Sequence, residues 1–195
     1  MKTIGFFGGS FNPPHLGHIA LADTIAASGM VDEVWLVLSP LNPLKSGDTD
    51  LASDTDRLAM LRLAVEGHPS LRVCDVELSM PRPSYTVDTL SRLSEEYPDF
   101  RFRLIVGEDN WRVFDRWRDA ATLRGRYAPI VYRRGGNDAP VLGADTLQDA
   151  PLLPMSGTAI RRLLAEGGDV NNMVDEKVYR YILAHRLYGV GGGNL

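Results

Sequence analysis

One stretch of the sequence decides the fold: Thr3-Ile4-Gly5-Phe6-Phe7-Gly8-Gly9-Ser10-Phe11-Asn12-Pro13-Pro14-His15-Leu16-Gly17-His18. The short apolar run 3–7 predicts a buried strand, and a loop rich in glycine and proline follows it. A helix is expected over 16–28, with Ile19, Ala22, Ile25 and Ala26 on one side. Strand, glycine loop and helix in this order predict the first unit of a parallel α/β sheet.

The rest of the chain repeats this alternation. Further strands are expected at 34–38, 102–106, 128–132 and 152–153, with an extended segment at 71–78. Helices are expected at 54–66, 86–97, 111–123, 158–166 and 175–187, and 133–147 is expected to be irregular. The pattern predicts an α/β fold, a Rossmann-like, doubly wound parallel sheet with helices on both faces. A single domain with a small C-terminal helical part should cover 1–188, followed by a flexible glycine-rich tail at 189–195.

The bulk composition is that of an ordinary soluble protein. The chain has 195 residues, 44% of them hydrophobic and 24% charged. Its formal charge of −4 argues against a broad nucleic-acid-binding face. Cys74 is the only cysteine, so no internal disulfide can form, as expected in a reducing cytoplasm. Neither a signal-peptide core nor a run of roughly 18 apolar residues is present, so we expect a cytoplasmic protein that does not enter a membrane.

Two histidines, His15 and His18, stand three residues apart where the first helix begins. This spacing puts both imidazoles on one side of the helix. Together with the backbone N–H groups of Gly8 and Gly9 they can hold a polyphosphate, or stabilise charge that develops at a phosphorus atom. Taken alone, the pair also fits surface residues or a helix cap, and a zinc site would lack a third ligand nearby.

A second string, Met155-Ser156-Gly157-Thr158-Ala159-Ile160-Arg161-Arg162, opens a helix near the other end of the chain. Ser156 or Thr158 can cap this helix, and its free N–H groups favour a phosphate. Arg161 adds a forked cation one turn in. By itself the string also fits an ordinary capped amphipathic helix.

These two strings resemble the signatures of the nucleotidyltransferase superfamily. Residues 9–18 match G-x-F-x-P-x-H-x-G-H throughout, and 155–161 resemble I-S-S-T-x-I-R with Gly157 in a serine position. The segments 39–45, 84–90, 106–111 and 114–117 are similar to those of bacterial nicotinate-nucleotide adenylyltransferases, and this likeness extends from Lys2 to about Tyr188. The chain departs from that family's pattern at Glu108, Trp111, Arg134 and Gly157.

The resemblance implies an activity and a set of roles. It implies transfer of AMP from ATP, with Mg²⁺, to nicotinate mononucleotide, giving nicotinate adenine dinucleotide and pyrophosphate for NAD biosynthesis. His15, His18 and Arg161 are implied to be catalytic. Those three and further residues are implied to bind ATP: Gly8, Gly9, Ser10, Phe11, Gly107, Asp109, Ser156 and Thr158. The mononucleotide is implied to contact Lys45, Thr86, Asp109 and Trp117. No metal ligand is implied within the protein, the partners are small molecules, and a homo-oligomer is compatible with the sequence.

Other readings of these residues stay open. Trp117 can be a core residue, Asp109 a helix cap, Lys45 a solvated lysine and Thr86 a plain N-terminal helix residue. The acceptor can be nicotinamide mononucleotide or another phosphorylated compound. A nucleotide-binding module without activity is a further alternative, against which the intact His15, His18 and Arg161 argue.

Overall fold

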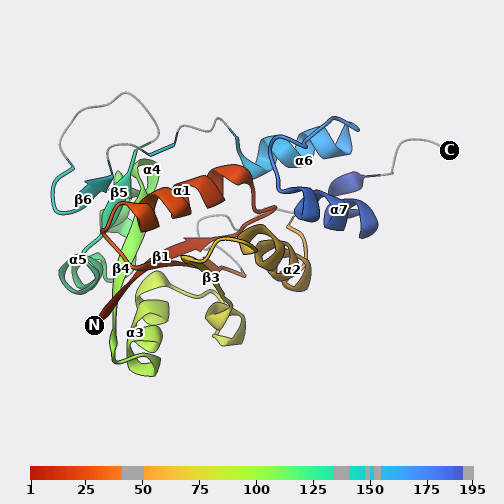
Figure 1. The fold of residues 1–195 in the computed structure, drawn as a ribbon. Helices are drawn as coiled ribbons and strands as arrows, with labels where there is room; N and C mark the ends of the chain where they lie inside the picture. Colours follow the sequence, from red (N-terminus) through yellow and green to blue (C-terminus); the bar gives the residue numbers. More distant parts are fainter. Residues whose placement is uncertain (41–50, 134–140, 148–149, 152–154, 191–195) are drawn as a thin grey trace.

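A parallel sheet forms the centre of this computed structural model, which describes residues 1–40, 51–133, 141–147, 150–151 and 155–190. Within these ranges the sheet has six strands in the order β3-β2-β1-β4-β5-β6 (Figure 1). The strands are β1 (Lys2–Gly9), β2 (Glu33–Leu38), β3 (Leu71–Cys74), β4 (Phe100–Gly107), β5 (Ile130–Tyr132) and β6 (Asp145–Leu147). The chain builds outward from β1 to β3 and then returns to the other side of β1 with β4. Strand order therefore reverses at β1, where ligands bind in sheets of this type.

The middle of the central strand β1, residues 4–7, is apolar and buried because both faces of the strand are covered there. Ile4 and Phe6 are buried in one hydrophobic cluster, and Phe7 belongs to the cluster on the opposite face. Phe6 is paired with Trp35 of β2 on one side and with Leu104 of β4 on the other. The continuous apolar run that predicted this strand thus reflects burial between two layers of helices.

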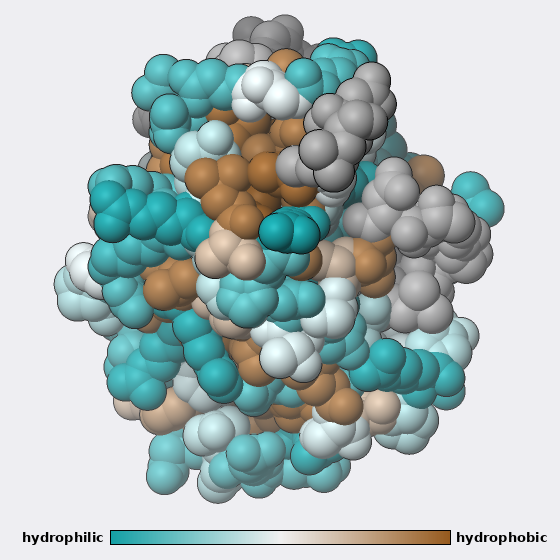
Figure 2. Space-filling view, turned by 90° about the vertical axis from the view of Figure 1, so that its right-hand side faces the viewer, coloured by the Kyte–Doolittle hydropathy of each residue, from teal (hydrophilic) through white to brown (hydrophobic). Residues whose placement is uncertain are grey.

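Helices cover both faces of the sheet, as the sequence predicts. One face carries α1 (Leu16–Ala27), α2 (Asp54–Val65), α6 (Gly157–Ala165) and α7 (Glu176–Ala184). The other carries α3 (Thr86–Glu96) and α5 (Ala120–Tyr127). In Figure 1, α1 lies above the sheet and α3 below it, while α6 and α7 form the expected C-terminal helical part beside α2. Figure 2 faces that side and shows hydrophobic surface bordered by hydrophilic residues.

The prediction of one continuous helix over 111–123 is wrong. A short helix α4 (Glu108–Trp111) and a 3-10 turn η3 (Phe114–Arg116) come first, and α5 begins only at Ala120. Asp119 explains the break, because it adopts a left-handed backbone with φ 50° and its carboxylate accepts from the Thr122 N–H. An N-cap there starts a new helix.

Other boundaries also differ. The extended segment expected at 71–78 is a strand only over β3, and a 3-10 helix η2 (Val76–Ser79) follows it. The region expected to be irregular ends in the three-residue strand β6. The last expected helix ends at Ala184, after which Arg186 has φ 50° and a 3-10 turn η4 (Leu187–Gly189) closes the described chain.

Some expectations fall outside the described residues. These are the short strand at 152–153 and residues 191–195 of the tail. Among the helices that are described, none combines the length and the apolar character that crossing a membrane requires.

Candidate active site

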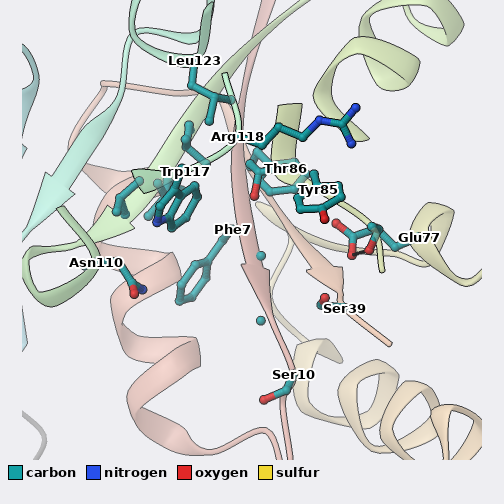
Figure 3. A pocket seen from close by; sticks show the side chains of 18 of the residues that line it. Phe7, Ser10, Ser39, Glu77, Tyr85, Thr86, Asn110, Trp117, Arg118 and Leu123 are labelled. Carbon is teal, nitrogen blue, oxygen red and sulfur yellow. Dashed lines mark hydrogen bonds between the residues drawn. The ribbon is translucent and has the colours of Figure 1, made fainter. Parts of the chain in front are cut away.

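A cavity of about 400 Å³ opens where the central strands end. The end of β1, the end of β4 and the start of α3 form its walls, and Trp117 lies at one side (Figure 3). The cavity lining includes six of the residues singled out in the sequence: Gly8, Gly9, Ser10, Thr86, Gly107 and Trp117. It therefore joins residues expected at the ATP side to residues expected at the mononucleotide side, at the point where strand order reverses.

Other expected residues do not line this cavity. His15, His18, Phe11, Ser156, Thr158 and Arg161 lie apart from its lining, around the loop after β1 and the start of α6. Asp109 is exposed in the first turn of α4, and its neighbour Asn110 lines the cavity instead. Lys45 and Arg134 lie outside the described residues.

Trp117 presents a flat aromatic surface to the cavity. Its ring packs on the buried Phe114 with 5.1 Å between centroids and an angle of 33°. Figure 3 shows Trp117 with Phe7 on one side of the cavity, and Thr86 with Tyr85 on another. Within the described part of the chain the buried Nε1 of Trp117 has no hydrogen-bond partner. This arrangement can sandwich a planar ring while polar groups of α3 contact its substituent.

A buried carboxylate fixes the start of α3, a residue that the sequence analysis missed. Glu77 is 5% exposed and accepts hydrogen bonds from Ser84 Oγ at 2.7 Å and Thr89 Oγ1 at 3.0 Å. Because Ser84 and Thr89 lie on either side of Thr86, the carboxylate holds the first turn of α3 in place. A polar triplet of this kind has no local sequence signal, since Glu77 belongs to a different element.

The histidine pair is ordered by its own contacts. The imidazole rings of His15 and His18 are stacked, with 3.6 Å between their centroids and 20° between their planes. The backbone N–H of His15 donates to Nδ1 of His18 at 3.2 Å. Since Nδ1 accepts, the proton of a neutral His18 ring lies on Nε2, which makes Nε2 a donor. Phe11, 1% exposed, packs edge-on against His18 at 5.1 Å.

The second string begins α6 as expected, with Ser156 and not Thr158 as its N-cap. The Ser156 hydroxyl accepts from the Ala159 N–H at 3.2 Å. Arg161 Nη1 donates to the Asn12 carbonyl oxygen at 2.9 Å. The two strings, far apart in the sequence, therefore meet in space.

Gly157 explains why the helix can approach so closely. A Cβ atom at this position would lie 2.8 Å from the Asn12 carbonyl oxygen, closer than side chains tolerate. Glycine in place of the serine of the family pattern is thus tied to the contact between α6 and the loop after β1. At Gly107 a Cβ would lie 2.9 Å from Tyr132 Oη, which is the end of a side chain and not backbone as at Gly157.

Arg57 is the second residue that sequence reasoning missed. Its side chain is fully buried on α2, on the same face as Leu61 and Ala64. All five of its N–H donors are used. The acceptors are the carbonyl oxygens of Ala52 (3.1 Å), Ser10 (2.7 Å), Ser39 (2.8 Å) and Pro40 (3.2 Å) and the carboxylate of Asp54 (2.5 Å).

Two features of the surroundings of Arg57 act on its pKa in opposite directions. Burial lowers the pKa of the guanidinium, and the hydrogen-bonded Asp54 carboxylate acts against that shift. Arg57 precedes the buried apolar residues Leu61 and Ala64 by four and seven positions, which places it on the buried face of the helix. This spacing was the available sequence signal, because a buried arginine requires hydrogen-bond partners inside the protein.

Glu108, a departure from the family pattern, forms an ion pair within its own segment. Its carboxylate accepts from Arg112 Nη2 at 3.1 Å within the same helical segment. The unfavourable effect of a carboxylate beside an anionic substrate is thereby reduced.

Comparisons with known proteins agree with this geometry. Residues 6–163 match the family described as cytidylyltransferase-like. A probable nicotinate-nucleotide adenylyltransferase of Bacteroides fragilis is 43% identical over 182 residues, covering 92% of this chain and 90% of the relative. One from Cytophaga hutchinsonii is 39% identical over 188 residues, with 95% and 97% covered.

Solved structures share the fold. The nicotinic acid mononucleotide adenylyltransferase of Plasmodium falciparum, complexed with NaAD, superposes with a TM-score of 0.79 at 21% identity, covering 96% of this chain and 98% of the other. A putative nicotinate-nucleotide adenylyltransferase of Vibrio parahaemolyticus gives a TM-score of 0.73 at 22% identity, with 97% and 96% covered.

Proposed function

Because the chain belongs to the nicotinate-nucleotide adenylyltransferases, within the cytidylyltransferase-like family, we propose that it transfers AMP from ATP to nicotinate mononucleotide. The products are nicotinate adenine dinucleotide and pyrophosphate, a step of NAD biosynthesis. The observation that carries the proposal is the meeting of the two strings at Asn12 and Arg161, next to a cavity bounded by Trp117 and Thr86. One region holds phosphate-binding groups and the other holds a surface for a planar ring.

The reaction is a direct displacement at the α-phosphorus of ATP. An oxygen of the mononucleotide 5′-phosphate forms a bond to this phosphorus, while the bond from the phosphorus to the bridging oxygen breaks and its electron pair leaves with pyrophosphate. The protein aligns two anions and offsets their charge, so it needs no covalent intermediate.

On the ATP side, the loop after β1 and the start of α6 are assigned to the phosphates. The Nε2–H of His18 donates to oxygen that gains charge in the transition state, and His15 supports the same region. Arg161 holds the β- and γ-phosphates, with Ser156 and Thr158 at the helix start. Four further loop residues surround the nucleotide: Gly8, Gly9, Ser10 and Phe11.

On the acceptor side, Trp117 stacks on the pyridine ring and Thr86 contacts its carboxylate. Gly107, which is assigned to ATP, lines the same cavity at the end of β4. Asp109 is assigned to a ribose hydroxyl and Lys45 to a phosphate, two roles that follow from the family resemblance alone.

ATP enters as its complex with a divalent ion, Mg²⁺ in this proposal. Nucleotidyl-transfer enzymes use such an ion to reduce the charge on the phosphates. No group of three or more His, Cys, Asp or Glu side chains that could hold a metal occurs in the described ranges. The donors around the loop are imidazoles and a guanidinium, which fit phosphate oxygens, so we assign the ion to the ATP phosphates.

The proposal also includes the extent of the domain and the place where the enzyme works. Residues 1–188 act as one nucleotidyltransferase domain, and the enzyme works in the cytoplasm on small-molecule substrates.

Pyrophosphate release tests the function. Purified protein is assayed with ATP, Mg²⁺ and either nicotinate or nicotinamide mononucleotide. We expect turnover with the nicotinate form. Faster turnover with nicotinamide mononucleotide would make that compound the preferred acceptor. ATP binding without turnover of either mononucleotide would identify an inactive nucleotide-binding module.

A further inference from the structure

Tyr188 connects the end of the described chain to the loop after β1. Its hydroxyl donates to Oδ1 of Asn12 at 2.7 Å, across 176 residues of sequence. Tyr188 lies beyond residues 6–163, which match the family, and outside both signature strings. A role for it is therefore not implied by either motif.

The backbone at Tyr188 is held in an unfavourable conformation. Its φ of 57° and ψ of 32° lie in the left-handed region, which residues other than glycine seldom adopt. Such a conformation persists only where surrounding contacts compensate for it. The η4 turn that contains Tyr188 packs against α6, the helix that carries Arg161.

Asn12 is the point on which these contacts converge. Its side chain is 5% exposed, and Oδ1 accepts from the Ala52 N–H at 3.1 Å as well as from Tyr188. Its backbone carbonyl accepts from Arg161 Nη1 at 2.9 Å. The orientation of Asn12 therefore decides where this carbonyl, and with it the guanidinium of Arg161, is placed.

The hydroxyl of Tyr188 stays protonated in this setting. Burial raises the pKa of Tyr188, and the positive charges of Arg161 and Arg57 oppose the rise without cancelling it. A neutral phenol can donate a hydrogen bond to an amide oxygen, as the contact with Asn12 requires.

We propose that Tyr188 is a positioning residue for the ATP side of the site: its hydroxyl fixes Asn12, and the Asn12 carbonyl fixes Arg161 on the phosphates. The inference rests on the proposed function, in which Arg161 holds the β- and γ-phosphates. Tyr188 itself does not contact substrate. The C-terminal turn thus serves the ATP loop directly, in addition to covering the core.

Tyr188→Phe tests this, with Tyr181→Phe as the matched control. Tyr181 also lies in the C-terminal part, and its hydroxyl donates at 3.0 Å to Asp56 Oδ1 on α2 and not to Asn12. Each variant loses one hydroxyl bond, so we expect similar small decreases in Tm. In Tyr188→Phe, kcat/KM for ATP should fall about tenfold while KM for nicotinate mononucleotide changes by less than about twofold. Tyr181→Phe should leave both constants near those of the wild type.

A double-variant cycle tests the route through Arg161. In an Arg161→Ala background, Tyr188→Phe should lower kcat/KM for ATP by less than about twofold, because the group it positions is gone. A persisting tenfold loss, or equal effects of Tyr188→Phe and Tyr181→Phe, would overturn the inference.

Calorimetric titration with ATP separates this inference from the proposed function. Weaker ATP binding by Tyr188→Phe than by Tyr181→Phe supports the positioning role even if the wild type does not turn over nicotinate mononucleotide. An inactive wild type rejects the proposed function alone, and unchanged ATP binding in Tyr188→Phe rejects the positioning role alone.

Discussion

Arg57 Nη1 donates a 2.7 Å hydrogen bond to the carbonyl oxygen of Ser10, so a side chain of α2 fixes the loop that follows β1. The same nitrogen donates to the carbonyl of Ser39 at 2.8 Å, just after β2. Buried backbone carbonyls need donors, and loops at the ends of adjacent strands have no ladder to supply them. One guanidinium thus joins two loops that both contribute to the lining of the cavity, through Ser10 and Ser39.

Replacement of Arg57 by lysine should be costly although charge is kept. Lysine has three donors for five acceptors and cannot match their planar arrangement. We expect a loss of about 2–4 kcal/mol in the free energy of unfolding and a higher KM for both substrates. Urea denaturation and steady-state kinetics measure these effects. Arg62→Lys is the control, because Arg62 lies on the same helix with an exposed side chain. Equal stability of the two variants would contradict the role of Arg57.

His18→Ala should lower kcat by about 10²–10³ with the fold intact, because it removes the Nε2 donor proposed to act at the transition state. Stopped assays of pyrophosphate release and thermal melting separate catalysis from stability. His68→Ala is the control, since His68 lies outside both signature strings, contacts Asp23 at 2.7 Å and should leave kcat unchanged. Near-normal turnover by His18→Ala would refute the catalytic assignment.

Trp117→Ala should raise KM for the mononucleotide at least tenfold and change KM for ATP little. Loss of a stacking surface costs about 1–3 kcal/mol for the stacked ring. Trp111→Ala is the control, because Trp111 packs on the same Phe114 at 4.6 Å but does not line the cavity. It should lower Tm without changing either KM. If both substrates lost affinity equally in Trp117→Ala, Trp117 would be a core residue.

The sequence predicted the elements whose pattern is local. The opening stretch could be interpreted because β1, its loop and α1 are adjacent and each has its own signal: a buried apolar run, glycines and helical spacing. The start of α6 was predictable for the same reason, since Ser156 caps the helix it precedes.

Contacts between distant segments were not predictable in this way. Nothing near Asn12 in the sequence indicates that its amide meets Tyr188, or that its carbonyl meets Arg161. The helix expected over 111–123 failed because its aromatic residues pack as a tertiary cluster around Phe114 and only imitate a helical period. The family pattern places Asp109 at the ATP and mononucleotide sites; it lies exposed in the first turn of α4, and its role stays a prediction.

Glu33 should make stability depend on pH. Burial acts to raise its pKa, but hydrogen bonds from Lys2 at 2.5 Å and Trp35 at 3.3 Å, together with Arg72, outweigh burial and lower the pKa below 4.5. A lowered folded-state pKa adds stability above the unfolded-state value, and that stability is lost as the pH falls through the folded-state pKa.

Glu33→Gln should therefore be less stable than the wild type by roughly 1 kcal/mol at pH 7, and the difference should shrink as the pH falls through the lowered folded-state pKa of Glu33. Urea denaturation at several pH values measures it. The exposed Glu95 provides the control, and Glu95→Gln should change stability by less than about 0.5 kcal/mol at any of these pH values. A constant deficit for Glu33→Gln across the range would show that ionisation is not its cause.

Gly157→Ala should show whether the close approach of α6 to the Asn12 carbonyl outweighs the higher helix propensity of alanine. Alanine normally stabilises a helix relative to glycine by about 0.5–1 kcal/mol. At Gly157 the added Cβ would lie 2.8 Å from the Asn12 carbonyl oxygen and push α6 away from the loop, displacing Arg161. We expect a loss of about 1–3 kcal/mol in unfolding free energy and a lower kcat/KM for ATP.

Gly125→Ala is the matched substitution for this test. Gly125 lies within α5 and no atom stands within 4 Å of its would-be Cβ, so the change should stabilise the protein and leave kinetics unchanged. If Gly157→Ala were equally stabilising, the contact between α6 and Asn12 would have to be loose. The chain's departure from serine at this position would then have no structural cause in the approach of α6 to the loop.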